Sequence, residues 1–469
     1  MQTVSLIPPA AQPSTCLPPD DALRIELHNE VHARPSARIR LPALITYVAV
    51  LNGGVSVAAE RAHLSQLPTQ GKQVSDQLHD SFLRLRGEGF TLKWERHTEF
   101  SRYSIVQPLP ELAALGAAEP DLLTDLAVPP DWLRQIPGRT VAAVQLVMVN
   151  APLEDARALM AQAITWLGGR TVVASLMGSN AASAAALGAD GSQLQGYAHP
   201  MVHSWALTQF QLQQDGFERM LVIAPDGTSQ TRAGRIAGRL LELETYRLMA
   251  LRGLPAAKAL GPWLAQAEND LASITARLEN KSASDQELLD TLVALAASVE
   301  RATAENVYRF SATQAYYTLV GQRIAELREK AIPGTQTMGE FMQRRLSPAM
   351  ATVAATHQRM TSLSERVART SDLLRTRVDI ATEVQNQQLL EKLTRGQELQ
   401  LRLQSTVEGL SIAAISYYVI SLLLYGGKAL KSAGVPINPE IVAGAMVPLV
   451  LWAVWRTTQK IHARLHTPH

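Results

Sequence analysis

The sequence predicts an α+β protein in three parts: an N-terminal α/β domain, a long helical region and a C-terminal pair of membrane-spanning helices. Runs rich in valine, isoleucine and threonine, which favour strands, stop near residue 230. Beyond that point nearly every segment has the spacing of an amphipathic helix. Two uncharged apolar runs then follow one another close to the C-terminus.

Length, charge and cysteine content limit the class of protein. A chain of 469 residues is long enough for two or three domains. The formal net charge of +2 provides no broad basic surface, so nucleic acid is not an expected partner. Cys16 is the single cysteine, which excludes an internal disulfide framework and fits a reducing compartment. Residues 1–20 are rich in proline and lack the features of a signal peptide, which predicts a disordered leader.

The predicted α/β domain spans residues 21–230. The β-branched runs at 41–53 and 139–150 predict buried strands, and the segments RTVVASLMGS and ERMLVIAPDG predict further ones. Residues 90–106 alternate apolar and polar side chains over their first half, as a half-exposed strand does. Residues 151–169 have helical spacing and end in a glycine pair, which predicts a helix after a strand.

Residues 231–409 form the predicted helical region. Glycine, proline and polar stretches divide it into helices at about 231–252, 256–281, 284–331 and 337–409. The last of these, with roughly 70 residues, would be about 100 Å long.

This long helix has two apolar patches at three- and four-residue spacing. Their members are Leu374, Val378 and Ala381 in the first, and Leu403, Val407 and Leu410 in the second. Such patches require partner helices, as in a coiled coil. Glutamines between the patches interrupt the seam, so a perfect zipper is not expected.

Residues 410–469 are the predicted membrane part, with spans at about 410–430 and 437–455 and a basic tail. Each uncharged core is shorter than the roughly 20 residues that cross a bilayer, so flanking residues complete the length. Aromatic residues stand at the ends of the apolar runs, as at membrane interfaces. The alternative is a buried hairpin in a soluble core, although both runs are apolar on all sides.

Basic residues predict the orientation of the two spans. Six lie before the first span or after the second, and two lie in the loop: Lys392, Arg395, Arg402, Arg456, Lys460 and Arg464, against Lys428 and Lys431. The positive-inside rule therefore predicts cytoplasmic termini and a cytoplasmic soluble domain.

Small residues recur on one face of the first span. The stripe consists of Gly409, Ala413, Ser416, Ile420 and Gly427. Such a stripe permits close approach of helices and also lines narrow pores. Packing against the second span is the equally open alternative.

Four stretches carry a resemblance that covers nearly the whole chain: NEVHARP (29–35), LELETYRLMALRGLP (241–255), SERVARTSDLLRTRVDIATEVQNQQLL (364–390) and LQLRLQSTVEGLSIAAISYY (399–418). They resemble a bacterial family of uncharacterised membrane-anchored proteins. This resemblance implies attachment to the bacterial inner membrane and supplies no catalytic residues.

The order of the parts is also similar to the plan of CorA-type magnesium transporters. In that family a pentamer encloses a pore lined by the first span, which ends in a Tyr-Gly-Met-Asn signature. Tyr425 and Gly426 match this signature, whereas Gly427 and Lys428 do not. A ring of lysines at the mouth of a cation pore is electrostatically unfavourable.

Two polar clusters are candidate sites. His28 and His32 are four residues apart, as in a helical metal site. The zincin arrangement requires glutamate directly after the first histidine, where Asn29 stands, so the end of a packing helix is the ordinary alternative. The family resemblance covers His32 and Arg34, which remain candidates for a polar cluster.

The second cluster lies in KWERHTEFSRY (93–103), which also contains Arg96 and Arg102. On one alternating strand Glu95, His97 and Glu99 share a face and could form a polar pocket or cation site. A ladder of ion pairs across strands is the ordinary alternative.

Other motifs are weak. Residues 177–192 are small and follow a strand but lack the lysine and glycine spacing of a phosphate loop. His199 and His203 bracket Pro200, which disrupts helical geometry. No nucleophile–base arrangement can be proposed from spacing, so an enzyme is not expected.

The sequence therefore leaves two main functions open. One is a homo-oligomeric divalent-cation channel or transporter, with Ser416, Ile420, Tyr425, Gly426 and Gly427 at the pore and Mg²⁺ as the transported or regulatory ion. The alternative is a non-transporting, membrane-anchored scaffold or regulator. The expected partners are the lipid bilayer and further copies of the chain, and the scaffold or regulator would also bind a protein or a small ligand. No resident cofactor is expected.

Overall fold

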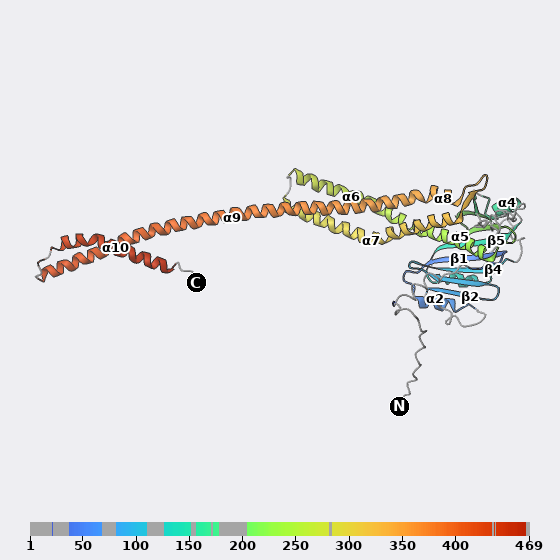
Figure 1. Cartoon of the computed structure of the whole chain (residues 1–469), viewed down its shortest axis with the longest axis horizontal. Helices are drawn as coiled ribbons and strands as arrows, with labels where there is room; N and C mark the ends of the chain where they lie inside the picture. Colours follow the sequence, from blue (N-terminus) through green and yellow to red (C-terminus); the bar gives the residue numbers. More distant parts are fainter. Residues whose placement is uncertain are drawn as a thin grey trace, which may run out of the picture. The chain divides into compact units, whose positions relative to one another are not determined.

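The computed structural model describes residues 21, 37–67, 81–109, 126–151, 156–169, 172–177, 204–280, 284–433, 436 and 438–465 (Figure 1). The predicted leader, His28, His32, Arg34, His199, His203 and nearly all of the 177–192 segment lie outside these residues. The chain divides into two compact units, which are Met1–Ser273 with Ala294–Val367, and Ile274–Val293 with Ala368–His469.

The first unit is built on one mixed sheet of nine strands, in the order β2-β3-β4-β1-β5-β8-β7-β6-β9. The strands are β1 (Ala43–Leu51), β2 (Phe82–Arg86), β3 (Thr91–Arg96), β4 (Phe100–Pro108), β5 (Arg139–Asn150), β6 (Val173–Met177), β7 (Ser204–Leu212), β8 (Glu218–Ala224) and β9 (Glu329–Ala331). Only β5 and β8 pair in parallel among these strands, and every other pairing is antiparallel. The predicted α/β domain is therefore confirmed.

The central strand β1 is buried on both faces, which explains its unbroken apolar sequence. Ile45 and Tyr47 point toward α5 (Gln230–Leu251). Leu44 points toward α4 (Ala156–Trp166). Val48 packs with α2 (Val57–Leu64) and α3 (Pro130–Arg134). Helices thus cover both faces of the sheet.

Residues 90–106 do not form the single strand that the alternation suggested. β3 ends at Arg96 and β4 begins at Phe100, so the segment is a hairpin. The Asn52 side chain donates to the carbonyl of His97 (2.7 Å) and holds the turn. His97 and Glu99 consequently lie in the turn rather than on a strand face.

A second difference is β9, which lies in a segment predicted to be helical. Arg328 has φ of 51°, a left-handed conformation that ends α7 (Asp285–Leu327). β9 then pairs with β6 at the edge of the sheet. The carboxylate of Glu329 fixes this edge, because it accepts from Ser175 Oγ (2.7 Å) and from the amides of Met338 and Gly339.

The helical region contains α5, α6 (Gly253–Glu279), α7, α8 (Met338–Arg345) and α9 (Ser347–Ser432). The predicted helix at 337–409 is split at its start, because a capping box between Thr337 and Glu340 begins the short α8. Pro348 occupies the first turn of α9, where proline is tolerated. α9 then runs for 86 residues without a break through the first apolar run.

The second unit contains the ends of α6 and α7, most of α9, and α10 (Pro439–Leu465). Leu374 of α9 is fully buried there. Arg377 donates to the carbonyl of Leu278 in α6 (2.9 Å) and pairs with Asp285 in α7 (3.1 Å). The beginning of the first apolar patch, at Leu374, therefore finds its partner helices within the same chain.

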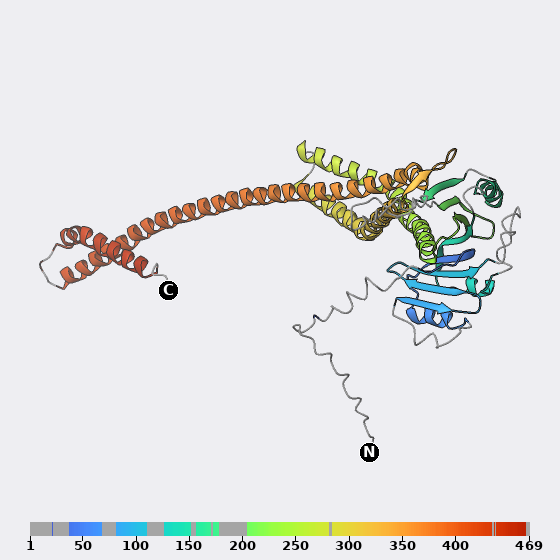
Figure 2. The same cartoon turned by 45° about the vertical axis from the view of Figure 1, so that its right-hand side comes forward.

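The last part of α9 and α10 form an antiparallel hairpin within the second unit (Figures 1 and 2). Ser416, Ala443 and Val450 are buried between them. By length and composition, α9 and α10 are the two described helices that could cross a membrane. Only 6% and 11% of the residues in their most apolar windows are buried, so they are not a core hairpin within this chain.

Two glycines on one face of α5 provide a test of the packing between α5 and the chain before β1. A Cβ at Gly234 would lie 1.6 Å from the carbonyl oxygen of Ala37, whereas a Cβ at Gly238 would meet no atom within 4 Å. We expect Gly234→Ala to lower the free energy of unfolding by about 1–3 kcal/mol through overpacking. Gly238→Ala is the matched control and should raise it by up to about 1 kcal/mol, because alanine favours helix. Thermal unfolding of the full chain in detergent measures both, and equal effects would contradict the described contact.

Candidate functional site

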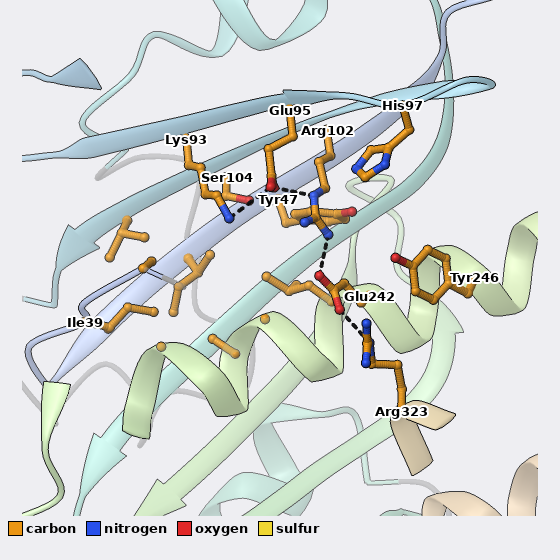
Figure 3. Close-up of a pocket in the computed structure, with 17 residues that line it drawn as sticks. Ile39, Tyr47, Lys93, Glu95, His97, Arg102, Ser104, Glu242, Tyr246 and Arg323 are labelled. Atoms are coloured by element: carbon orange, nitrogen blue, oxygen red, sulfur yellow. Dashed lines mark hydrogen bonds and ion pairs between the residues drawn. The ribbon is translucent and has the colours of Figure 1, made fainter. Parts of the chain in front are cut away.

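A cavity of about 300 Å³ lies between the sheet and α5 in the first unit (Figure 3). Its floor is formed by β1, β3 and β4, its roof by α5, and Arg323 enters from α7. The lining side chains that carry charge are Lys93, Glu95, Arg102, Glu242 and Arg323. A volume of this size accommodates a small organic molecule.

The cavity exists because α5 presents small residues to the sheet. Gly234, Ala237 and Gly238 line its roof, and the space above Gly238 is open. Ile39 and Ile45 line the floor at this end, together with other apolar side chains. One end of the cavity is therefore apolar.

The other end carries a chain of alternating charges. Lys93 Nζ lies 3.1 Å from Glu95 Oε1, and Arg102 Nε donates to Glu95 Oε2. Arg102 Nη1 donates to Glu242 Oε1 (2.9 Å), and Arg323 Nε donates to Glu242 Oε2 (2.6 Å). Figure 3 shows these contacts crossing from the sheet to the helices. Arg323 Nη1 also donates to Glu326 Oε1 (2.7 Å) outside the cavity lining, so each cation of the network has a carboxylate partner.

Sheet geometry brings the first members of this network together. Lys93 and Glu95 are two residues apart on β3, so both point to the cavity side. Glu95 stands directly opposite Arg102 in the β3–β4 register, which places their side chains in contact. Exposure rises from 1% for the side chain of Glu95 to 22% for that of Arg323, so the network runs from the interior to the surface.

The environment fixes the charge of these groups. Burial alone would raise the pKa of Glu95, but Arg102 and Lys93 together hold it below its usual value. Burial lowers the pKa of Lys93, although Glu95 opposes this effect. Burial raises the pKa of Tyr47, whose hydroxyl lies 2.7 Å from Thr245 Oγ1, so this phenol stays neutral. Glu95 is therefore an anion held by cations.

Of the predicted cluster, Glu95 and His97 line the cavity and Glu99 does not. Glu99 instead accepts two bonds from Arg309 of α7, at 2.6 and 3.2 Å. Arg96 belongs to the other face, where it bonds to Glu60 (2.5 Å). The predicted shared face of Glu95, His97 and Glu99 is thus wrong, because the strand ends before His97.

The cation site proposed for this cluster does not fit the contacts. Among the residues that the structure describes, no group of three or more His, Cys, Asp or Glu side chains could hold a metal ion. Glu95 and Glu242 already bind guanidinium groups. Each carboxylate is therefore already paired with cationic side chains, with which a metal ion would have to compete.

A second charged cluster lies beside the sheet, away from the cavity lining. Glu218 and Glu244 are both buried and share Arg247, which donates to Glu244 and lies 3.8 Å from Glu218 Oε2. Thr208 Oγ1 donates to Glu218 Oε1 (2.9 Å). Burial, reinforced by the neighbouring carboxylate of Glu244, raises the pKa of Glu218 well above its ordinary value of 4.5.

The pore candidates take different positions in the α9–α10 hairpin. Ser416 is buried, and a Cβ at Gly427 would meet Pro439 Cβ at 3.3 Å, so both lie against α10 of the same chain. Ile420 is half-buried, whereas Tyr425 and Gly426 are exposed. Two of the five candidates therefore serve the packing of the hairpin.

Residues 19–465 match the family described as "Protein of unknown function (DUF3422)". The chain belongs to this family. No curated protein and no solved structure matches it. The resemblance to an uncharacterised family over nearly the whole chain is thereby confirmed, and the DUF3422 match includes both the cavity and the C-terminal hairpin. The resemblance to CorA-type transporters has no support from these comparisons.

The Glu218 cluster makes the stability of this DUF3422 chain depend on pH. The native state retains the proton of Glu218 above pH 4.5, where the unfolded chain releases it, so the unfolding free energy falls as pH rises. We expect a slope of up to about −1.4 kcal/mol per pH unit from this group, beginning near its ordinary pKa. Glu218→Gln should remove this contribution. Urea denaturation of both full-length proteins between pH 4 and 8 measures the difference, and parallel pH profiles would contradict the assignment.

Proposed function

We propose that this DUF3422 chain is a membrane-anchored, non-transporting binding protein whose α/β unit holds a small organic anion. The observation that carries the proposal is a cavity that is apolar at one end and lined at the other end by the cationic side chains of Lys93 and Arg102. An anion in such a site gains charge-assisted hydrogen bonds from these donors.

The two ends of the cavity support a ligand class. The polar end offers Lys93 and Arg102, which suit a carboxylate. Lys93 has three donors, and its contact with Glu95 Oε1 uses one of them. Ile39, Ile45 and the small residues of α5 suit a short apolar body. A monocarboxylate with a short aliphatic chain meets both requirements within about 300 Å³.

The C-terminal hairpin supports the anchor. The part of α9 from Leu410 to Ser432 and the whole of α10 each exceed the roughly 20 residues that cross a bilayer. Their exposed surface is made of large apolar side chains such as Leu422, Leu449 and Trp452. The basic residues at both ends favour cytoplasmic termini, and the ligand-binding unit would then lie in the cytoplasm of a bacterial cell.

The positions of Ser416 and Gly427 favour this function over transport. Both lie against α10 of their own chain and not on a free face of α9. A pore lined by the first span would need such small residues to face the pore axis. We propose no reaction for the cavity, because its carboxylates are held in ion pairs.

The anchor is tested by fractionation of cells that produce the full chain. We expect the protein in the membrane pellet after ultracentrifugation and after a sodium carbonate wash, which removes peripheral proteins. Release requires detergent because two apolar helices lie in the hydrocarbon core. Recovery in the supernatant without detergent would contradict the proposal.

The ligand class is tested by thermal unfolding of the full chain in detergent with acetate, butyrate and hexanoate. At about 100 times the dissociation constant a ligand stabilises the fold by about 2.7 kcal/mol, or about 5 °C. We expect butyrate or hexanoate to raise the unfolding temperature by this amount. Hexan-1-ol and butylamine lack the carboxylate and should not raise it. Lys93→Met should weaken the affinity about tenfold, through loss of a charged hydrogen bond.

A cavity-filling variant supplies the matched control for this measurement. Gly238→Leu fills the open space in the roof and should abolish the shift. Gly261→Leu introduces the same side chain at another open helical glycine, in α6 and outside the cavity lining, and should leave the shift unchanged. The ligand class would be contradicted if the carboxylates shifted the unfolding temperatures of both variants equally. It would also be contradicted if none of the carboxylates raised the unfolding temperature of the wild-type protein.

A further inference from the structure

The two apolar patches predicted on the long helix differ in how far they are buried in the second unit. The first patch is partly covered, since Leu374 is fully buried beside α6 and α7 and Val378 is half-buried, whereas Ala381 is exposed. In the second patch Leu403, Val407 and Leu410 are 68%, 62% and 68% exposed. The first patch therefore has partner helices within the chain for part of its length, and the second does not.

The uncovered part of α9 is long. Every side chain from Asp379 to Val407 is exposed. Helices in proteins gain most of their stability from the packing of an apolar face, and a helix without such packing is marginal in water. Leu389 and Leu393, which are 58% and 57% exposed, add to the apolar surface in this segment.

The exposed apolar residues form a regular seam. Counting by four and three residues alternately gives Leu389, Leu393, Gly396, Gln400, Leu403, Val407, Leu410 and Ala414, which we name the stalk seam. This is the heptad spacing that lets two helices pack along their length. The flanking Leu390 and Leu399 are also exposed and widen the apolar face.

The stalk seam lies on the side of α9 that turns away from α10. At about 100° per residue, Leu403, Val407 and Leu410 lie between about 120° and 180° around the helix from Ser416. Ser416 faces α10 of the same chain. The hairpin therefore leaves the seam bare.

From this geometry we infer that the stalk seam packs against the stalk seam of a second copy of the chain, with the two α9 helices parallel and in register. Identical helices in register bring identical side chains face to face, so a charge in the seam would repel itself. The seam contains no charged residue. It can therefore meet its own copy without electrostatic cost.

The arrangement of charged residues around the stalk seam also favours a second copy of the chain as its partner. Glu391 and Arg395, and likewise Glu398 and Arg402, are four residues apart and lie outside the seam. This spacing stabilises each helix by itself and leaves the seam to the partner. Gln400 is the polar residue in the seam, a position where such a side chain specifies register by pairing with its counterpart.

The parallel register rests on the proposed membrane anchor. Two copies inserted in one bilayer by the same residues place their seams at the same height and in the same direction. No adjustment of register is then needed to bring Leu403 of one copy beside Leu403 of the other. An antiparallel pair would require the two chains to be anchored in opposite orientations.

Disulfide cross-linking in membranes tests the inference. In a Cys16→Ser background, the full chain carries Leu403→Cys or Val407→Cys in the seam, or Leu401→Cys as the control. Leu401 is an equally exposed leucine, at 60%, on another side of the helix. A disulfide requires Cα atoms about 4.4–6.8 Å apart, which a packed seam provides and an outward position does not.

We expect a seam cysteine to give about ten times more cross-linked dimer than Leu401→Cys under mild oxidation. Yields at both seam positions no higher than at Leu401 would overturn the inference. Leu403→Asp should also lower the mass of the detergent-purified chain to that of a monomer, whereas Leu401→Asp should not. A monomeric wild type would equally overturn it.

The membrane anchor is scored separately in the same preparation. A chain found in the supernatant that still cross-links through the seam would contradict the anchor and retain the pairing. A chain found in the pellet without seam cross-links would retain the anchor and contradict the pairing.

Discussion

The buried pair of Glu95 and Arg102 is the contact on which the arrangement of the first unit depends. Their side chains are 1% and 9% exposed, so neither charge can be left to water. Removing one member of such a pair leaves an uncompensated buried charge, which costs about 3–5 kcal/mol. Arg102 also binds Glu242 of α5, and Glu242 binds Arg323 of α7. The pair on the sheet therefore fixes where both helices lie, and the cavity is the space that remains beneath the small residues of α5.

The local periodicity of the sequence was sufficient to predict those helices and strands whose burial is uniform along their length. β1 and β5 were predicted because strands buried on both faces are unbroken apolar runs, and α5 because its apolar residues follow a helical period. The prediction failed at 90–106, since alternation of side chains does not reveal a turn that interrupts the strand. It failed again at β9, where the conformation of Arg328 and the bonds to Glu329 override helical composition.

The candidate site was predicted only in part, for a related reason. Glu95, His97 and Arg102 stand in one short segment, so their clustering was visible in the sequence. Glu242 and Arg323 come from α5 and α7, and no local pattern links them to β4. Only the fold brings these partners together, and it shows that the carboxylates of the predicted cation site are already bound by guanidinium groups. The long helix α9 differs in this respect, because both of its apolar patches could be found by spacing, and the structure was needed only to show which patch packs against helices of the same chain.

The sharing of Glu242 between Arg102 and Arg323 has a consequence for the proposed binding function. The carboxylate of Glu242 accepts from two guanidinium groups, one on the sheet and one on α7. A ligand carboxylate that approached Arg102 would compete with Glu242 for the same donors and would place two anions side by side, which is unfavourable unless one moves. Glu242 can then keep Arg323 and withdraw from the sheet, because Arg323 is the more exposed of its two partners. Binding in the cavity would thus loosen the link between the sheet and the helices at the contact that now holds them together.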